Sequence, residues 1–417
     1  MQILTITADH PPYHSGGYEL RIKEIMDGLA LRGHKVHVLT TVRNQRSNKG
    51  SEESSYPVRR ILSNRYNAKW FPKELLQDLI DTKTLEKEIG EIQPDLIYLG
   101  HTYPLTKQLL PYLASLQVPI FYDEGGNGLK GAWTDHGRWF EFAGDYRIRF
   151  RFLNLIKPTV VRLVLWMSRG RIKNMWSFPE RMIMFFNSEL NRNNAKFFGV
   201  PVENDQVIHS GVDIEKFAFV LKQKLSNPII IIIPGRIELK KGQLDGVKLI
   251  QELSSCGIEA ELLLVGPSSL DGYLDVLENE IDKLNLTDKV HFIRMVDQDQ
   301  MVELYHKADM CLFSSYHHSG FSRVPLEAMA CGCAVLSYGN EGSDEVITDH
   351  CNGFITETGG IHDLVEVIKK VVENPRLLEN VCVNARNNIE INYSLSRYID
   401  QLEHELYSSI SAKFRSC

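Results

Sequence analysis

Two cations lie close together in the segment Pro234-Gly-Arg-Ile-Glu-Leu-Lys-Lys-Gly242. The segment directly follows the apolar run Ile229–Ile233, which is typical of a buried strand. An arginine offers a planar fork and a lysine a compact charge, and the two are complementary ways to hold phosphate oxygens. Arg236 and Lys241 are therefore candidates for stabilising the charge that accumulates on a departing phosphate. The alternative is that both are solvated residues of an ordinary loop.

A second segment, Ser319-Gly-Phe-Ser-Arg-Val-Pro-Leu-Glu327, indicates a turn that leads into a short helix opening near Val324. A helix N-terminus presents backbone N–H groups that suit an anionic ligand. A carboxylate near a helix start can face the same ligand, or it can simply interact favourably with the helix dipole. The candidate contacts in this segment are Ser319, Gly320, Phe321, Ser322 and Glu327.

In the N-terminal part, Gly16 and Gly17 stand between a predicted strand at Ile3–Thr7 and a predicted helix at Leu20–Arg32. Glycines here let the backbone approach a phosphate closely, and ligands of doubly wound sheets bind at the carboxyl ends of strands. The pair does not match Gly-x-Gly-x-x-Gly, so a nicotinamide cofactor is disfavoured. A purely structural turn is the alternative.

Three polar residues follow two further predicted strands. His101 comes after Leu96–Leu99, and Asp123 and Glu124 come after Pro119–Tyr122. A carboxylate at such a position can orient an acceptor hydroxyl or help to carry its proton. It can equally bind local backbone N–H groups and cap the next segment.

These segments belong to a chain in which short β-branched strands alternate with amphipathic helical stretches, the pattern of an α/β chain with parallel sheets. A new series of strands starts at Ile229–Ile233, after a polar, lysine-rich stretch. The length of 417 residues fits two domains of about 200 residues each. We expect two doubly wound units, at residues 1–205 and 206–394, and a final helix within 395–417 that could cross back to the first unit.

Composition excludes several classes of protein. Hydrophobic residues make up 43% and charged residues 24% of the chain, as in soluble globular proteins. The net charge of −6 argues against a nucleic-acid partner. All seven cysteines come after residue 255 without metal-ligand spacing, so we expect reduced thiols and no metal. No apolar run is long enough to span a bilayer and no signal peptide is evident, so we expect a cytoplasmic protein.

Over essentially the whole chain, and most specifically over residues 206–356, the sequence resembles retaining glycosyltransferases of the GT-B fold. This is the glycogen-synthase-like and sucrose-synthase-like family, known as family 4 or group 1. The motifs that carry the resemblance are Gly-Arg-x-x-x-x-Lys-Gly at 235–242, Gly-Phe at 320–321 and Leu-Glu-Ala-Met-Ala at 326–330. The resemblance implies an α/β GT-B fold, in which two Rossmann-like domains face a cleft. It also implies transfer of a sugar from a nucleoside diphosphate donor to an acceptor hydroxyl, without a metal or other cofactor.

The resemblance further implies roles for individual residues. The first domain would bind the acceptor, which in this family is commonly a cell-surface glycan or glycolipid, although a small molecule is also possible. Glu327 would bind the ribose hydroxyls and Val296 would lie in the base pocket. The other donor contacts would be Gly16, Gly17, Gly235, Gly266, Ser319, Gly320, Phe321 and Ser322, with Arg236 and Lys241 on the diphosphate.

The stretch from residue 125 to 180 is the part that least resembles the family. It contains four tryptophans and a basic run over 147–178 that has no acidic residue. Such a run can make peripheral contact with an anionic membrane surface at the inner face of the membrane, or line a site for a lipid-linked acceptor. The alternative is a helical pair that covers the core of the first domain.

The chain departs from the family pattern at two places. In the family a first Glu, which contacts the hydroxyls of the donor sugar, stands eight positions before the residue matching Glu327; here that position is Ser319, with His317 and His318 beside it. Many relatives also have a His where this chain has Asp123 and Glu124. Either a different sugar is used, or a histidine reaches in, or transfer has weakened. The alternative functions are a regulatory protein that binds a sugar nucleotide without transferring the sugar, and a phosphorolytic or epimerising relative.

Substitution of Ser319 tests the alignment of this turn. Ser319→Ala should be mild, because a neutral hydroxyl hydrogen bond contributes only about 0.5–1.5 kcal/mol net. Ser319→Glu should shift donor preference or lower turnover, because it places an unmatched carboxylate near the diphosphate. The measurement is the ratio of kcat/KM across several donor sugars. Unchanged ratios in Ser319→Glu would mean that position 319 does not face the sugar.

Overall fold

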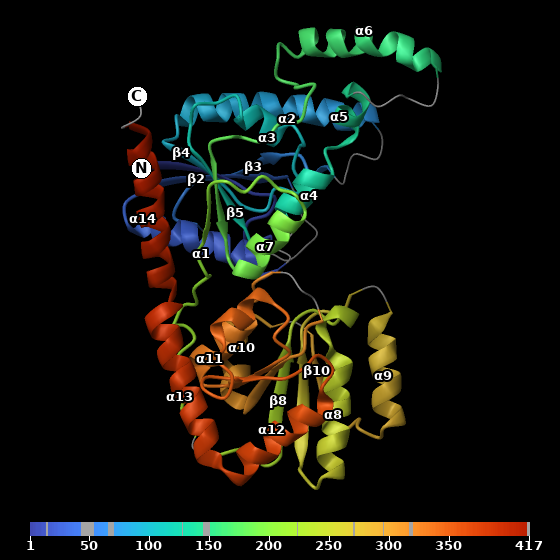
Figure 1. Cartoon of the computed structure of the whole chain (residues 1–417), viewed down its shortest axis with the longest axis vertical. Coiled ribbons are helices and arrows are strands. Elements are labelled where there is room, and N and C mark those ends of the chain that lie inside the picture. The colour runs from blue at the N-terminus through green and yellow to red at the C-terminus, as the bar shows by residue number, and fades with distance from the viewer. Residues whose placement is uncertain are drawn as a thin grey trace. The chain divides into compact units, whose positions relative to one another are not determined.

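The computed structural model describes residues 1–13, 16–42, 54–65, 71–126, 128–144, 151–222, 224–269, 272–294, 296–316 and 320–414. The chain forms two compact units, Met1–Ile208 together with Gln401–Cys417, and His209–Asp400. Each unit is built on one parallel sheet with helices packed around it (Figure 1). The predicted fold class, an α/β chain with two doubly wound sheets, is confirmed.

The first unit holds a seven-stranded sheet in the order β3-β2-β1-β4-β5-β6-β7. Every neighbouring pair is parallel. The strand order changes direction between β1 and β4, and ligands of such sheets bind beyond the carboxyl ends of the strands at that point. The strands are β1 Gln2–Ile6, β2 Lys35–Thr41, β3 Val58–Leu62, β4 Leu96–Leu99, β5 Ile120–Glu124, β6 Met182–Phe186 and β7 Asp205–Val207.

Two boundaries in this unit differ from the predicted ones by two or more residues for reasons visible in the structure. The first helix begins at Gly17, because Gly16 takes the extended capping position and Glu19 closes a capping box onto it. Strand β5 continues to Glu124, because Asp123 and Glu124 stay in register with Phe185 and Phe186 of β6. The helices are α1 Gly17–Leu31, α2 Phe71–Ile92, α3 Leu109–Leu113, α4 Gly128–Thr134, α5 Arg138–Ala143, α6 Arg151–Met167 and α7 Glu189–Phe197.

The second unit repeats the same design with a six-stranded parallel sheet in the order β10-β9-β8-β11-β12-β13. Its order changes direction between β8 and β11. The strands are β8 Ile229–Pro234, β9 Ala260–Val265, β10 Val290–Ile293, β11 Met310–Phe313, β12 Ala334–Ser337 and β13 Phe354–Ile355. The helices are α8 Gln243–Ser255, α9 Tyr273–Lys283, α10 Gln298–Lys307, α11 Val324–Cys331, α12 Ile361–Glu373 and α13 Pro375–Asn392, with short 3-10 turns η2 Leu239–Lys241 and η3 Gly342–Val346.

Strand β8 is an unbroken apolar run because both of its faces are buried. Successive side chains of a strand point to opposite faces of the sheet. Ile231 and Ile233 pack into a cluster with α8 and α9, whereas Ile232 packs into a second cluster with α10 and α11. Both faces are covered, so neither set of positions tolerates polar side chains.

Helix α6 packs on the first unit through one face only. Val161 and Val164 contact a small buried cluster that contains Trp139 and Phe140. On the other side Leu155 is 81% exposed and Trp166 78% exposed. Among the helices of the described residues, none has the length and apolar character needed to cross a bilayer.

The last helix, α14 Leu395–Phe414, begins in the second unit and continues in the first. Glu403 in this helix forms an ion pair with Arg32 at 2.8 Å and a hydrogen bond with Nε2 of His34 at 2.7 Å. Gln206 donates a hydrogen bond to Glu405 at 2.7 Å. The first unit is therefore assembled from two separate stretches of the chain.

Candidate functional site

In the second unit, the loops after β8, β9 and β11 approach one another through glycines. A Cβ at Gly266 would run into the carbonyl oxygen of Gly235, and one at Gly242 would run into that of Ser314. All three glycines have positive φ angles of 136° (Gly235), 146° (Gly266) and 67° (Gly242), which side-chain-bearing residues rarely adopt. Loop packing thus requires glycine at 242 and 266, whereas at 235 the backbone conformation alone favours it.

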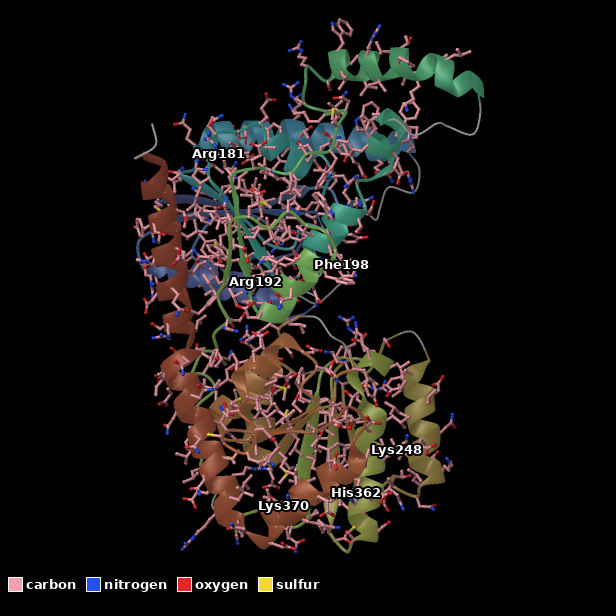
Figure 2. All side chains as sticks on the ribbon, viewed as in Figure 1. Arg181, Arg192, Phe198, Lys248, His362 and Lys370 are labelled. Atoms are coloured by element: carbon pink, nitrogen blue, oxygen red, sulfur yellow. The ribbon has the colours of Figure 1, made fainter. Side chains whose placement is uncertain are left out.

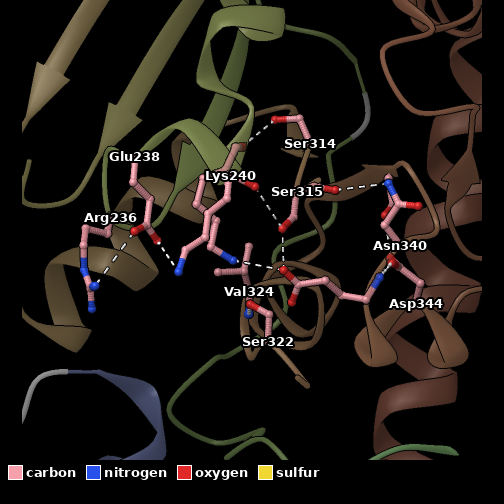
Figure 3. Close-up of polar contacts among 12 residues, drawn as sticks. Arg236, Glu238, Lys240, Ser314, Ser315, Ser322, Val324, Asn340 and Asp344 are labelled. Atoms are coloured by element: carbon pink, nitrogen blue, oxygen red, sulfur yellow. Dashed lines mark hydrogen bonds and ion pairs between the residues drawn. The ribbon is translucent and has the colours of Figure 1, made fainter. Parts of the chain in front are cut away.

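The side chains of the two predicted phosphate ligands, Arg236 and Lys241, have different surroundings in this loop. The Arg236 side chain is 49% exposed, and its nearest carboxylate is Glu238 at 3.9 Å. The Lys241 side chain is only 23% exposed, and its Nζ lies 3.0 Å from Oε1 of Glu341 (Figure 3). The Lys241 ammonium also lies 5.7 Å from the centroid of the Phe313 ring, at the end of β11. Both cations therefore stand at the carboxyl ends of the strands where the sheet order changes direction.

The turn before α11 supplies the next group of predicted contacts. The carbonyl oxygen of Gly320 accepts a hydrogen bond from the backbone N–H of Gly342 at 3.0 Å. The Ser322 hydroxyl accepts one from the N–H of Val324 at 3.3 Å, which begins the helix together with Pro325 (Figure 3). Phe321 is buried. The predicted contact Ser319 and its neighbours His317 and His318 lie outside the described residues.

Glu327 is held on the first turn of this helix. Its Oε1 lies 3.1 Å from Nε of Arg323, and its Oε2 accepts from the Tyr305 hydroxyl at 3.3 Å. Burial, and then the charge of Glu327, raises the pKa of the nearby Cys331 thiol to about 12. The predicted base-pocket residue Val296 packs partly buried just before α10. The structure thus places Glu327 in the same unit as the two cations, on the helix that follows the turn bonded to Gly342.

The predicted residues of the first unit gather at the ends of β1, β4 and β5. The backbone N–H of Gly16 donates to Oε2 of Glu19 at 3.1 Å, so this glycine has a capping role in the structure. The Nδ1 of His101 lies 3.8 Å from Oε1 of the same Glu19. With a side chain 35% exposed, His101 is the most accessible of the three polar residues predicted here.

Asp123 and Glu124 are buried and engaged with protein groups. Asp123 pairs with Arg21 and accepts from the Tyr98 hydroxyl at 2.6 Å. Glu124 accepts from the backbone N–H groups of Gly126 at 2.6 Å, of Gly128 at 3.2 Å and of Leu129. Burial raises the pKa of Glu124, and those N–H groups counteract the rise. These contacts agree with the structural alternative, in which the two carboxylates bind neighbouring protein groups. Their participation in proton transfer stays a prediction.

Three residues that complete these clusters were not predicted from the sequence. Glu19 and Arg21 on α1 contact His101 and Asp123 respectively, and their signal was their position on the helix that follows the glycine pair. Glu341 contacts Lys241 from a loop that is 100 residues away in the sequence, and no local sequence pattern predicts a contact of that separation.

Two surface hollows of the second unit lie apart from these residues. One lies between α8, α9 and α12 and includes Lys248 and His362 in its lining (Figure 2). The other lies beside α12 and includes Tyr338 and Lys370. Neither is lined by Arg236, Lys241 or Glu327. Within the described residues there is no cluster of three or more side chains suited to hold a metal ion.

Comparison with known proteins identifies the class of protein that this fold and these motifs define. A family model described as Glycosyltransferase Family 4 matches residues 15–216, and one described as Glycosyl transferases group 1 matches residues 215–388. The chain therefore belongs to the group 1, or family 4, glycosyltransferases.

Individual relatives agree with this assignment. An uncharacterized glycosyltransferase of Methanocaldococcus jannaschii is 29% identical over 203 residues, which span 47% of this chain and only half, 50%, of that protein. The glycogen synthase of Mycobacterium tuberculosis is 20% identical over 412 residues, covering 93% of this chain and 90% of that protein. The crystal structure of Anabaena HepE in complex with UDP has a TM-score of 0.69 at 19% identity, covering 98% of this chain and 100% of that chain. The fold is GT-B.

Substitution of the two cations tests their assignment to phosphate. Lys241→Ala and Arg236→Ala should each cost on the order of 2–4 kcal/mol of transition-state stabilisation, because a fixed cation beside a departing diphosphate is lost. The measurement is kcat/KM with the donor that the protein turns over. Lys240→Ala is the matched control, because Lys240 is in the same loop and pairs only with Glu238, at 3.4 Å, among the ion pairs of the described residues. Wild-type turnover in Lys241→Ala and Arg236→Ala would contradict the assignment.

Proposed function

We propose that this protein transfers a sugar from a nucleoside diphosphate donor to an acceptor hydroxyl, with retention of the anomeric configuration. The observation that carries the proposal is the placement of Arg236 and Lys241 in the loop after β8, beside the end of β11, in the unit that also carries Glu327. Membership of the group 1 glycosyltransferases supports the same reaction class. HepE, a structural neighbour, was solved with UDP, which supports a nucleotide as part of the donor.

In the proposed reaction the bond between the anomeric carbon and the diphosphate oxygen breaks, and a bond to the acceptor oxygen forms. The departing diphosphate takes the electron pair, and its negative charge is met by Arg236, by Lys241 and by the N-terminus of α11. The acceptor proton passes to a phosphate oxygen, so the protein needs no nucleophile of its own. Glu327 holds the ribose hydroxyls, which fixes the reacting carbon relative to both cations.

The acceptor is proposed to be a cell-surface glycan or glycolipid. The first unit is proposed to bind this acceptor, with His101 more accessible than Asp123 and Glu124 at the carboxyl ends of its strands. The rival function is binding of a sugar nucleotide without transfer, which the serine at position 319 keeps open.

A donor screen separates these two functions. Thermal shift with UDP, GDP, ADP, TDP and CMP compounds would identify the base, and the sugar nucleotides of that base would then be incubated with lipid and glycan acceptors. Transfer with release of the nucleoside diphosphate, and a product whose anomeric configuration by NMR matches that of the donor, would support the proposal. Tight binding of a sugar nucleotide without turnover of any acceptor would favour the rival.

Chelation tests the proposed independence from metal. We expect activity to survive EDTA, because Arg236, Lys241 and the start of α11 can meet the diphosphate charge. The Asp-x-Asp pattern at 297–299 is engaged by the protein itself: the Asp297 side chain caps α10, and Asp299 pairs with Lys216 at 3.2 Å. The measurement is the rate of nucleoside diphosphate release before and after dialysis against chelator. Loss of activity in EDTA with rescue by Mn²⁺ or Mg²⁺ would refute this part of the proposal.

We further propose that the first unit contacts the inner face of the membrane through α6. The helix turns Leu155, Leu163, Trp166 and Met167 outward, and the run from 147 to 178 contains cations and no acidic residue. An apolar face flanked by cations binds an anionic lipid surface by burying side chains at the headgroup boundary. Because Val161 and Val164 pack inward, the helix can cover the core and face lipid at the same time.

Vesicle binding tests the role of α6. The wild-type protein should co-sediment with vesicles that contain phosphatidylglycerol, bind phosphatidylcholine vesicles less, and lose binding as salt is raised. Trp166→Glu and Leu163→Glu should each reduce binding to anionic vesicles about tenfold, because each adds a charge to the apolar face. The control is Leu31→Glu on α1, where the leucine is 88% exposed. Equal loss in all three variants would contradict a specific role for α6.

A further inference from the structure

A buried carboxylate stands among the residues that the proposed function assigns to the donor. Glu341 lies between the end of β12 and the turn η3, and its side chain is 4% exposed. Its Oε1 lies 3.0 Å from the Lys241 ammonium and also accepts a hydrogen bond from the Ser315 hydroxyl (Figure 3). Both contacts use the same oxygen of the carboxylate.

The backbone around Glu341 holds this carboxylate in place. Its N–H donates to the Asp344 carboxylate at 2.8 Å, and Asp344 in turn accepts from the Ser337 hydroxyl at the end of β12. The next residue, Gly342, donates its N–H to the carbonyl oxygen of Gly320 at 3.0 Å. The loop that carries Glu341 is therefore tied directly to the turn that leads into α11.

The presence of this carboxylate is not explained by phosphate binding. A carboxylate beside Lys241 repels a diphosphate. A buried ion pair does not by itself add stability to the fold either, because the free energy needed to remove two charges from water is about as large as the attraction between them. Carboxylate oxygens, in contrast, are strong acceptors for hydroxyl groups, and an ionised carboxylate has about four acceptor sites. Two of these are used by Lys241 and Ser315.

We propose that Glu341 is a specificity-determining residue that accepts hydrogen bonds from hydroxyls of the donor sugar. It would supply, from the loop after β12, the carboxylate that the turn before α11 lacks at position 319. The Lys241 ammonium has three N–H donors and can bridge this carboxylate and the diphosphate at once. The arrangement selects a neutral sugar, because an acidic sugar would place a second carboxylate against Glu341. This inference rests on the proposed function and deepens it.

The experiment separates binding of the sugar from binding of the nucleotide. Dissociation constants are measured by calorimetry for UDP, GDP and ADP and for UDP-glucose, GDP-mannose and ADP-glucose, with wild-type protein and with Glu341→Gln. For the base that binds, Glu341→Gln should weaken the nucleotide sugar about tenfold or more relative to the nucleoside diphosphate, because charge-assisted hydrogen bonds to hydroxyls are lost. The nucleoside diphosphate itself should bind as tightly as before or more tightly, because a negative charge beside Lys241 has been removed.

A matched control and a folding check complete the test. Glu345→Gln removes a carboxylate of the same turn that pairs with His209 at 2.8 Å and should leave both dissociation constants unchanged. The Tm of each variant shows that the fold is retained, and Glu341→Ala repeats the comparison should Glu341→Gln fail to fold. UDP-glucuronate gives a further readout if the protein binds UDP. It should bind the wild type more weakly than UDP-glucose, and Glu341→Gln should reduce the difference in affinity between these two nucleotide sugars.

The possible results distinguish this inference from the function on which it rests. If the wild type binds the nucleotide sugar and Glu341→Gln keeps the wild-type ratio of the two constants, Glu341 does not contact the sugar and the inference is wrong while the proposed function stands. If Glu341→Gln weakens both ligands equally, Glu341 only positions Lys241 and the inference is again wrong. If the wild type binds none of the six compounds and no other nucleotide of the donor screen, the proposed function fails and the inference fails with it.

Discussion

The close approach of the backbone loops at the carboxyl ends of β8, β9 and β11 is the constraint on which the second unit's candidate site depends. Gly266 leaves no room for a Cβ against the carbonyl oxygen of Gly235, and Gly242 leaves none against that of Ser314. This contact places the loop from Gly235 to Gly242 over the end of β11. Any larger side chain there would push Arg236 and Lys241 away from the turn that begins α11, because packed interiors do not yield by more than small shifts.

In the first unit, a buried ion pair holds together the elements that carry the candidate residues. Asp123 at the end of β5 binds Arg21 on α1 and the hydroxyl of Tyr98 on β4, and so links three elements that meet where the strand order changes direction. Removing one partner of such a buried pair leaves an unmatched charge, which typically costs about 3–5 kcal/mol. The carboxylates of this sheet edge therefore organise the unit, and the more exposed His101 is the group left facing outward.

The sequence predicted the elements whose pattern is local. Ile229–Ile233 is apolar at every position because both faces of β8 are covered, and this pattern marked the start of the second sheet. The strand β3 was not predicted, because Val58–Leu62 contains Arg59 and Arg60 and lies at a sheet edge. Loop motifs pointed to Arg236, Lys241 and Glu327, but Glu341 pairs with Lys241 across 100 residues. A contact of that separation leaves no periodic trace in one sequence.

The division of the first unit between two stretches of chain has a consequence for biosynthesis. The second unit is continuous from His209 to Asp400, whereas Arg32, His34 and Gln206 meet Glu403 and Glu405 only in α14. During translation, the emerging residues 1–208 must wait until nearly two hundred more residues have left the ribosome before these partners exist. The N-terminal unit is thus the first to be made and the last to be completed.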